Sequence, residues 1–239
     1  MKIRKQSGFT LVEIAIVLVI IGLLLGGILK GQELINSARV RNLADQNTGI
    51  QAAYYGFIDR YRQVPGDYPQ AAATTAIGVP VILPITIGPA AGGNGRVDNT
   101  LEEAAAVWEQ LAKANFIGGG FTPATAIPAN EGAYQLNAPI NAFNGPLTLT
   151  RNTDVAGANP QRLTLHLGLN IPVKIARELD LKVDDGQPTT GVLRLSAVVA
   201  GPFPNLHAVA AAGACTLAGP PIVYNIAGDT QNCGLAFLY

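Results

Sequence analysis

The chain has 239 residues, of which 49% are hydrophobic and only 13% charged, well below the roughly 25% charged residues of ordinary soluble domains. Some apolar surface is therefore expected to meet lipid or neighbouring molecules. Residues 1–62 carry eight Lys/Arg against four Asp/Glu, whereas residues 63–239 carry eight against twelve. This acidic second part argues against broad nucleic-acid binding, which needs a basic surface.

The N-terminus predicts a membrane span. Residues 1–8 carry three Lys/Arg, and the next 21 residues, 9–29, contain a single charge at Glu13. A helix of that length rises about 31 Å, enough to cross the hydrocarbon core of a bilayer. Because the positive cluster precedes the apolar segment, the positive-inside rule places the N-terminus in the cytoplasm and everything after Lys30 on the other side.

A secretory signal peptide is the first alternative, since it also begins with basic residues followed by an apolar segment. The apolar segment here is longer than the usual stretch of about 7–15 residues. No small-x-small cleavage site follows it, and the small residue Gly8 precedes it instead. A carboxylate such as Glu13 inside a bilayer costs about 2.5–3.5 kcal/mol, so we expect a partner that neutralises it.

The run Gly8-Phe9-Thr10-Leu11-Val12-Glu13, followed by an apolar helix, resembles the processing and assembly signature of type IV pilins and type II secretion pseudopilins. In that family a membrane peptidase cuts after the glycine, the new N-terminal residue is N-methylated, and the glutamate meets the N-terminal amine of a neighbouring subunit. The resemblance assigns processing to Gly8 and Phe9 and assembly to Glu13. Phe9 and Glu13 are four residues apart and therefore share one helix face.

A second, amphipathic half of the same helix is predicted over residues 31–63. Its apolar residues return at intervals near 3.6 residues, and most charged residues lie elsewhere. They are Leu43, Ile50, Tyr54, Phe57 and Tyr61. Because Gln46, Asn47 and Gly49 interrupt any heptad repeat, packing on a sheet is favoured over a coiled-coil dimer. Pro65-Gly66 ends the helix.

Residues 64–239 are predicted to form the head. Prolines among alternating apolar residues favour a long connection with one edge strand over residues 69–95. A helix is predicted from a capping box at Thr100 and Glu103 to the glycines at 118–120, with Trp108 as a core anchor.

The remainder of the head is predicted to be mostly β, with leucines alternating with polar residues near Leu147, Leu163 and Leu193. A short helix is expected over Pro172 to Leu179. The fold class is therefore α+β, a long N-terminal helix packed on a small antiparallel sheet, which also resembles the ladle-shaped fold of pilins. His166, polar amid leucines, is predicted to face solvent.

Cys215 and Cys233 are the only cysteines. In an extracytoplasmic head they are expected to form one disulfide, worth about 3 kcal/mol in the chain-entropy model. Two free thiols are the alternative. Many pilins of the resembling family also close a C-terminal loop with a disulfide.

No metal, cofactor or catalytic site is expected. Asp184-Asp185-Gly186 and the stretch Asn94 to Asp98 could offer oxygen ligands to calcium, which some pseudopilins bind, but neither has EF-hand spacing, and turn chemistry explains both. His166 and His207 have no neighbouring Ser/Asp or Cys group, and no HExxH, phosphate-loop or dinucleotide motif occurs. We therefore expect no enzyme, with a triad assembled only in space as the open alternative.

These observations divide the chain into a leader peptide (1–8), a transmembrane assembly helix (9–30), an amphipathic helix (31–63) and a head (64–239). The resemblance implies a structural subunit that is cleaved, N-methylated and polymerised into a type IV pilus-like filament; the large head favours a minor or specialised role. The alternative is a membrane-tethered extracytoplasmic binding or enzymatic domain that shares only the N-terminal signal.

The resemblance also implies partners and a location. The partners are copies of this chain, other pilins or pseudopilins, the prepilin peptidase/methylase, the inner-membrane assembly platform and the membrane. The expected location is the bacterial inner membrane, with the N-terminus cytoplasmic and the head periplasmic, or extracellular in an assembled filament.

Overall fold

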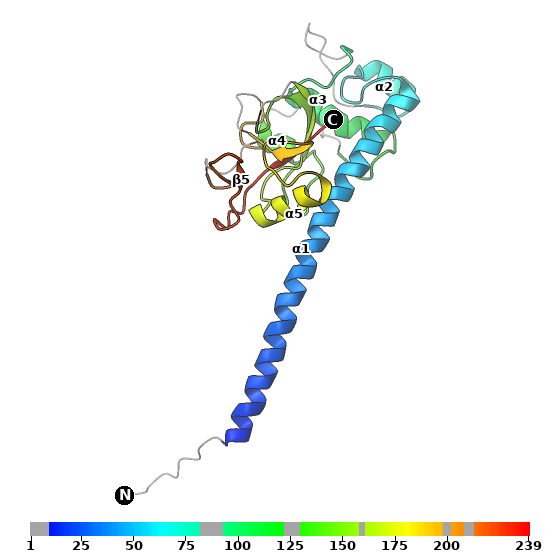
Figure 1. Ribbon diagram of the computed structural model, residues 1–239. Coiled ribbons are helices and arrows are strands. Elements are labelled where there is room, and N and C mark those ends of the chain that lie inside the picture. The colour runs from blue at the N-terminus through cyan, green and yellow to red at the C-terminus, as the bar shows by residue number, and fades with distance from the viewer. Residues whose placement is uncertain (1–9, 82–92, 122–129, 158–160, 198–201, 208–212) are drawn as a thin grey trace, which may run out of the picture. The chain divides into compact units, whose positions relative to one another are not determined.

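The computed structural model describes residues 10–81, 93–121, 130–157, 161–197, 202–207 and 213–239 (Figure 1). It confirms an α+β fold with a long N-terminal helix and a small antiparallel sheet. The chain forms two compact units, Met1–Arg39 and Val40–Tyr239. The helices are α1 (Leu11–Tyr61), α2 (Gln70–Ile77), α3 (Leu101–Lys113), α4 (Glu131–Gln135) and α5 (Val173–Val183). The strands are β1 (Thr148–Asn152), β2 (Arg162–His166), β3 (Leu193–Leu195), β4 (Thr216–Leu217), β5 (Val223–Tyr224) and β6 (Leu235–Leu238).

The first unit contains the N-terminal part of α1. Its large apolar side chains are exposed, from 45% at Ile21 to 90% at Leu11. An 18-residue window of α1 has a mean hydropathy of 2.8, so the helix is long and apolar enough to cross a membrane. Such a surface is unfavourable in water and requires an apolar environment.

The later part of α1 belongs to the second unit and buries the predicted stripe. Leu43, Ile50, Tyr54 and Phe57 are buried, and Tyr61 packs against the same core. The helix ends at Tyr61, and Gly66 follows with a φ of 92°. A Cβ on Gly66 would lie 2.4 Å from Cγ2 of Val107, so only glycine lets this turn approach α3.

The connection after α1 contains a helix that the sequence analysis did not predict. α2 begins after Pro69 and ends at Ile77, followed by Gly78 with a left-handed φ of 81°. The edge strand expected among residues 69–95 lies mostly within 82–92, outside the described residues. The carboxylate of Asp67 is buried. It accepts hydrogen bonds from two backbone N–H groups that follow residues 82–92, those of Asn94 at 3.1 Å and Gly95 at 2.7 Å.

Helix α3 crosses the core and begins at the predicted residue. The Thr100 hydroxyl accepts a hydrogen bond from the Glu103 N–H at 3.3 Å, which confirms the N-cap. The helix ends at Lys113, earlier than predicted, because Asn115 adopts a left-handed φ of 60°. Trp108 is fully buried as predicted, and its indole N–H donates to the Tyr134 hydroxyl at 2.8 Å.

The main sheet has the strand order β1-β2-β6-β3, with every pair antiparallel. The leucine alternation predicted β1, β2 and β3, whereas the strand between β2 and β3 was missed. All four residues of β6 are buried, so this strand lacks the alternation that marks a half-buried one. Helix α5 begins after Pro172 as predicted and runs to Val183, past the expected end. Cys215 and Cys233 form a disulfide, with Cα atoms 5.7 Å apart.

Candidate functional site

The single charge of the apolar segment lies in the first turn of α1. Glu13 Oε2 accepts hydrogen bonds from the Thr10 N–H and from the Thr10 hydroxyl, both at 2.8 Å. The Glu13 N–H donates in return to Thr10 Oγ1 at 3.3 Å. This reciprocal pair is a capping box, which satisfies groups that a helix start leaves unpaired. Thr10 was not among the predicted site residues, although the spacing T-x-x-E is the pattern of such a box.

The apolar segment from Ile14 to Leu29 consists of apolar residues and glycines and is suited to contacts with lipid or other helices. Gly22, Gly26, Gly27 and Gly31 have open space around them, since a Cβ at any of them would meet nothing within 4 Å. Glycines four residues apart allow close helix approach in lipid. The predicted processing residues Gly8 and Phe9 lie outside the described residues.

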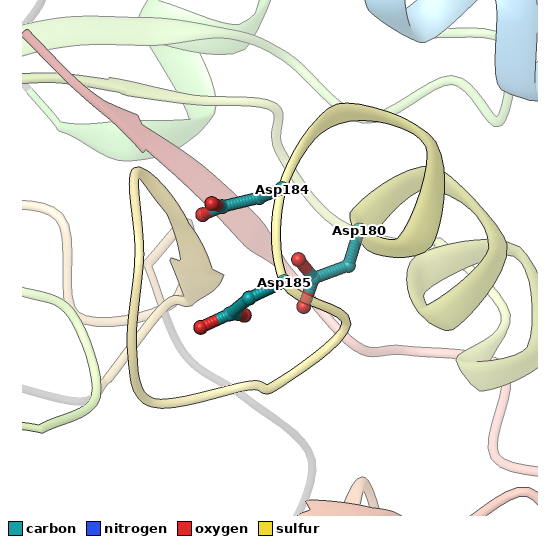
Figure 2. A group of neighbouring side chains, drawn as sticks. All are labelled: Asp180, Asp184 and Asp185. Atoms are coloured by element: carbon teal, nitrogen blue, oxygen red, sulfur yellow. The ribbon is translucent and has the colours of Figure 1, made fainter.

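Three carboxylates of the head gather around the end of α5, those of Asp180, Asp184 and Asp185 (Figure 2). Their ligand oxygens all lie within 4.8 Å of one another and could hold a cation. Burial raises the pKa of Asp180 to about 6, although the Tyr224 hydroxyl donates to it at 2.7 Å. Asp184 accepts from the Leu193 N–H at 2.9 Å, so the cluster also connects α5 to two strands.

The sequence predicted two members of this cluster as turn residues and missed Asp180. Asp180 directly follows the predicted helix end at Leu179, so helical spacing did not relate it to Asp184, whereas α5 continues to Val183. The other acidic stretch is bonded within itself: the Asp98 carboxylate accepts from the Asn94 amide at 2.8 Å and from the Arg96 guanidinium at 2.6 Å. The Arg96 N–H also donates to Asn94 Oδ1 at 3.0 Å, which is the turn chemistry expected there.

His166 and His207 form a stacked pair inside the head. Their ring centroids are 3.7 Å apart, their planes differ by 7°, and each residue is 1% exposed. The prediction that His166 faces solvent is therefore wrong. Its side chain lies against Ser196 and His207, which come from segments 30 or more residues further along the chain.

Hydrogen bonds define the protonation of His166. Asn152 Oδ1 accepts from the Asp154 N–H at 2.9 Å, so His166 Nε2, 3.3 Å from the same oxygen, is the donor. The other nitrogen, Nδ1, then accepts from the Ser196 hydroxyl at 2.8 Å. Burial and, second, the neighbouring His207 hold the pKa of His166 well below its ordinary value. His166 is therefore a neutral, fully hydrogen-bonded core residue.

The His207 ring lies between a carboxylate and a hydroxyl, the order of groups found in a hydrolytic triad. Its Nδ1–H donates to Asp154 Oδ2 at 2.8 Å, and its Nε2 lies 2.6 Å from the Thr148 hydroxyl. Thr148 is only 1% exposed, so its hydroxyl is shielded from any substrate in solution. The group therefore joins β1 to the segment of His207. Sequence reasoning missed it because Thr148 and His207 are 59 residues apart.

A comparison with protein families matches residues 3–29 to the prokaryotic N-terminal methylation motif. Searches of curated proteins and of solved structures found no match. The motif confirms the resemblance drawn from the sequence: the chain carries the prepilin-type signature of type IV pilins and pseudopilins. The signature supports a type IV pilin-like precursor, and the long apolar helix fits a membrane-anchored protein. The signature indicates a structural protein.

Proposed function

We propose that this protein is a structural subunit, a pilin or pseudopilin of minor or specialised kind. It is cleaved after Gly8, N-methylated on Phe9 and polymerised into a type IV pilus-like filament. The observation that carries the proposal is the position of Glu13. This carboxylate lies in the first turn of an exposed apolar helix, within the matched motif.

The physical basis is charge pairing in an apolar environment. Cleavage after Gly8 converts the Phe9 amide into a cation, which needs a partner once the helix lies among lipid or other helices. Glu13 provides that partner on an adjacent, staggered copy, and a copy out of register leaves both charges unpaired. The bonds from Thr10 keep the carboxylate at the N-terminal turn, where the amine of a neighbour can reach it.

The proposal includes a location and a set of partners. The N-terminus lies in the cytoplasm, α1 spans the bacterial inner membrane, and the head is periplasmic, becoming extracellular in a surface filament. The prepilin peptidase/methylase processes the chain. The inner-membrane platform then assembles it with its own copies or with other pilins or pseudopilins.

The test replaces Glu13 with alanine and uses Glu33→Ala as a matched control. Glu33 is an exposed glutamate of the same helix, 2.6 Å from Lys30. Glu13→Ala should leave cleavage and N-methylation intact, as measured by the mass of the N-terminal peptide. It should lower the yield of sheared filaments at least about tenfold, because each unpaired amine costs about 2.5–3.5 kcal/mol.

Glu33→Ala should assemble normally. Wild-type filament yield from Glu13→Ala would overturn the assembly role, and an uncleaved wild-type chain would overturn the processing role. A membrane-tethered domain that shares only the signal would function equally well with either substitution.

A further inference from the structure

The turn Phe203 to His207, called here the histidine turn, is attached to the head on two sides. The His207 N–H donates to the Phe203 carbonyl at 3.0 Å and closes the turn. On one side the His207 ring stacks on His166 of β2. On the other side the Glu131 carboxylate accepts from the Asn205 N–H at 2.9 Å and from the Asn205 amide at 2.5 Å. The first attachment consists of two histidine side chains, a residue type whose charge in water changes near neutral pH.

Among the described residues, one carboxylate is hydrogen-bonded to the histidine pair, that of Asp154. β1 contributes the neutral Thr148 and Asn152, the chain after β3 contributes Ser196, and β6 pairs Ala236 with His166. In the turn itself the Phe203 ring lies 5.1 Å from the His207 ring, and the nearby charge of α4 is Glu131.

One carboxylate compensates one imidazolium. Two imidazoliums stacked at 3.7 Å in this buried site would repel each other. Protonation of His166 in the closed turn is therefore costly.

We propose that the histidine turn is an acid-sensitive latch, which detaches from the sheet under mildly acidic conditions while the strands stay paired. Opening exposes both imidazoles to water, where a histidine binds a proton at an ordinary pKa of about 6.5. The open state thus binds more protons than the closed state, so the closed turn is fully stable above pH 6.5 and loses stability as the pH falls. Each extra proton raises the opening constant about tenfold per pH unit.

Hydrogen exchange of the full chain in detergent tests this from pH 7.5 to 5. The His207 amide reports the turn, and the Leu167 amide, bonded to the Leu235 carbonyl at 2.8 Å, reports the sheet. The protection factor of His207 should fall about tenfold per pH unit below about pH 6.5, while that of Leu167 stays constant. His166→Gln keeps a donor and an acceptor but cannot titrate there, so it should flatten this dependence. Glu131→Gln, which alters the other attachment, should preserve it.

A parallel loss of protection at His207 and Leu167 as the pH falls would overturn the proposal. An unchanged pH dependence of the His207 protection factor in His166→Gln would also overturn it. If that variant does not fold, the ring signals of wild-type His166 decide. A neutral His166 at pH 5.5 in the closed turn supports the latch. A protonated His166 beside a fully protected His207 amide overturns it.

Discussion

The N-terminal unit and the head differ in which side chains they expose and which they bury. From Leu11 to Leu29, α1 exposes its large apolar side chains, whereas the head buries polar ones such as Gln110 and His166. Gln110 binds the Gly66 N–H and the Tyr68 carbonyl, both at 2.8 Å. Leaving such buried groups unpaired would cost about 1–3 kcal/mol each. The head therefore stabilises itself by internal contacts, while the first unit depends on surrounding molecules.

The largest test of this difference removes one large side chain from each region. Trp108→Ala should lower the free energy of unfolding of the head by about 3–5 kcal/mol, because it leaves a cavity and removes the hydrogen bond to Tyr134. Leu24→Ala, at a side chain that is 60% exposed, should change it by less than about 0.5 kcal/mol. Urea unfolding of the full chain in detergent, followed by circular dichroism, measures both. Equal changes in the free energy of unfolding for the two variants would contradict this difference between the two regions.

A second test removes the covalent constraint of the head. Replacing both Cys215 and Cys233 by serine should lower the stability of the head by about 3 kcal/mol, since the bond closes a loop across 18 residues of sequence separation. The same urea experiment measures this loss. Alkylation of the wild-type chain without reductant, which should leave its mass unchanged, is the control. Identical midpoints for the variant and the wild type would show that internal packing alone stabilises the segment.

The smallest expected effect is a stabilisation of the head, opposite in sign to the two losses of stability above. Burial raises the pKa of Asp180 to about 6, above its ordinary 3.8, so the folded state binds more protons than the unfolded state between these values. This carboxylate therefore destabilises the head increasingly as the pH rises through that window. Asp180→Asn should stabilise the head by about 1–2 kcal/mol at pH 7.5 and have little effect at pH 4. Unfolding at the two pH values tests this, and a loss of stability at pH 7.5 would contradict it.

The features that could be predicted from the sequence depend on residues close together along the chain. The cap at Thr100, the stripe from Leu43 to Phe57 and the leucines of β2 follow from local spacing, and the structure contains all three. The prepilin-type signature is also local, so the motif at residues 3–29 was recognised in full.

The features that were missed depend on tertiary neighbours. β6 is buried on both faces, since Leu235 and Phe237 belong to the main core and Ala236 and Leu238 pack with Val155, so its residues show no period of two. The His166–His207 pair joins residues 41 positions apart, and no local pattern brings an imidazole to a partner at that distance. The short helix α2 has eight residues, four of them alanine, and it was missed because the prolines and alternating apolar residues that follow it favoured an extended connection.

The central position of β6 has a consequence for the order of events during synthesis. β2 and β3 are joined only through residues 235–238, which are translated after every other strand of the sheet. Until then both strands have an unpaired edge facing the same gap, which is the kind of surface that mispairs with other chains. The apolar segment of α1, by contrast, is complete after the first 29 residues. An early anchor is thus followed by a late-closing sheet, and the interval between the two is when this protein is most exposed to misassembly.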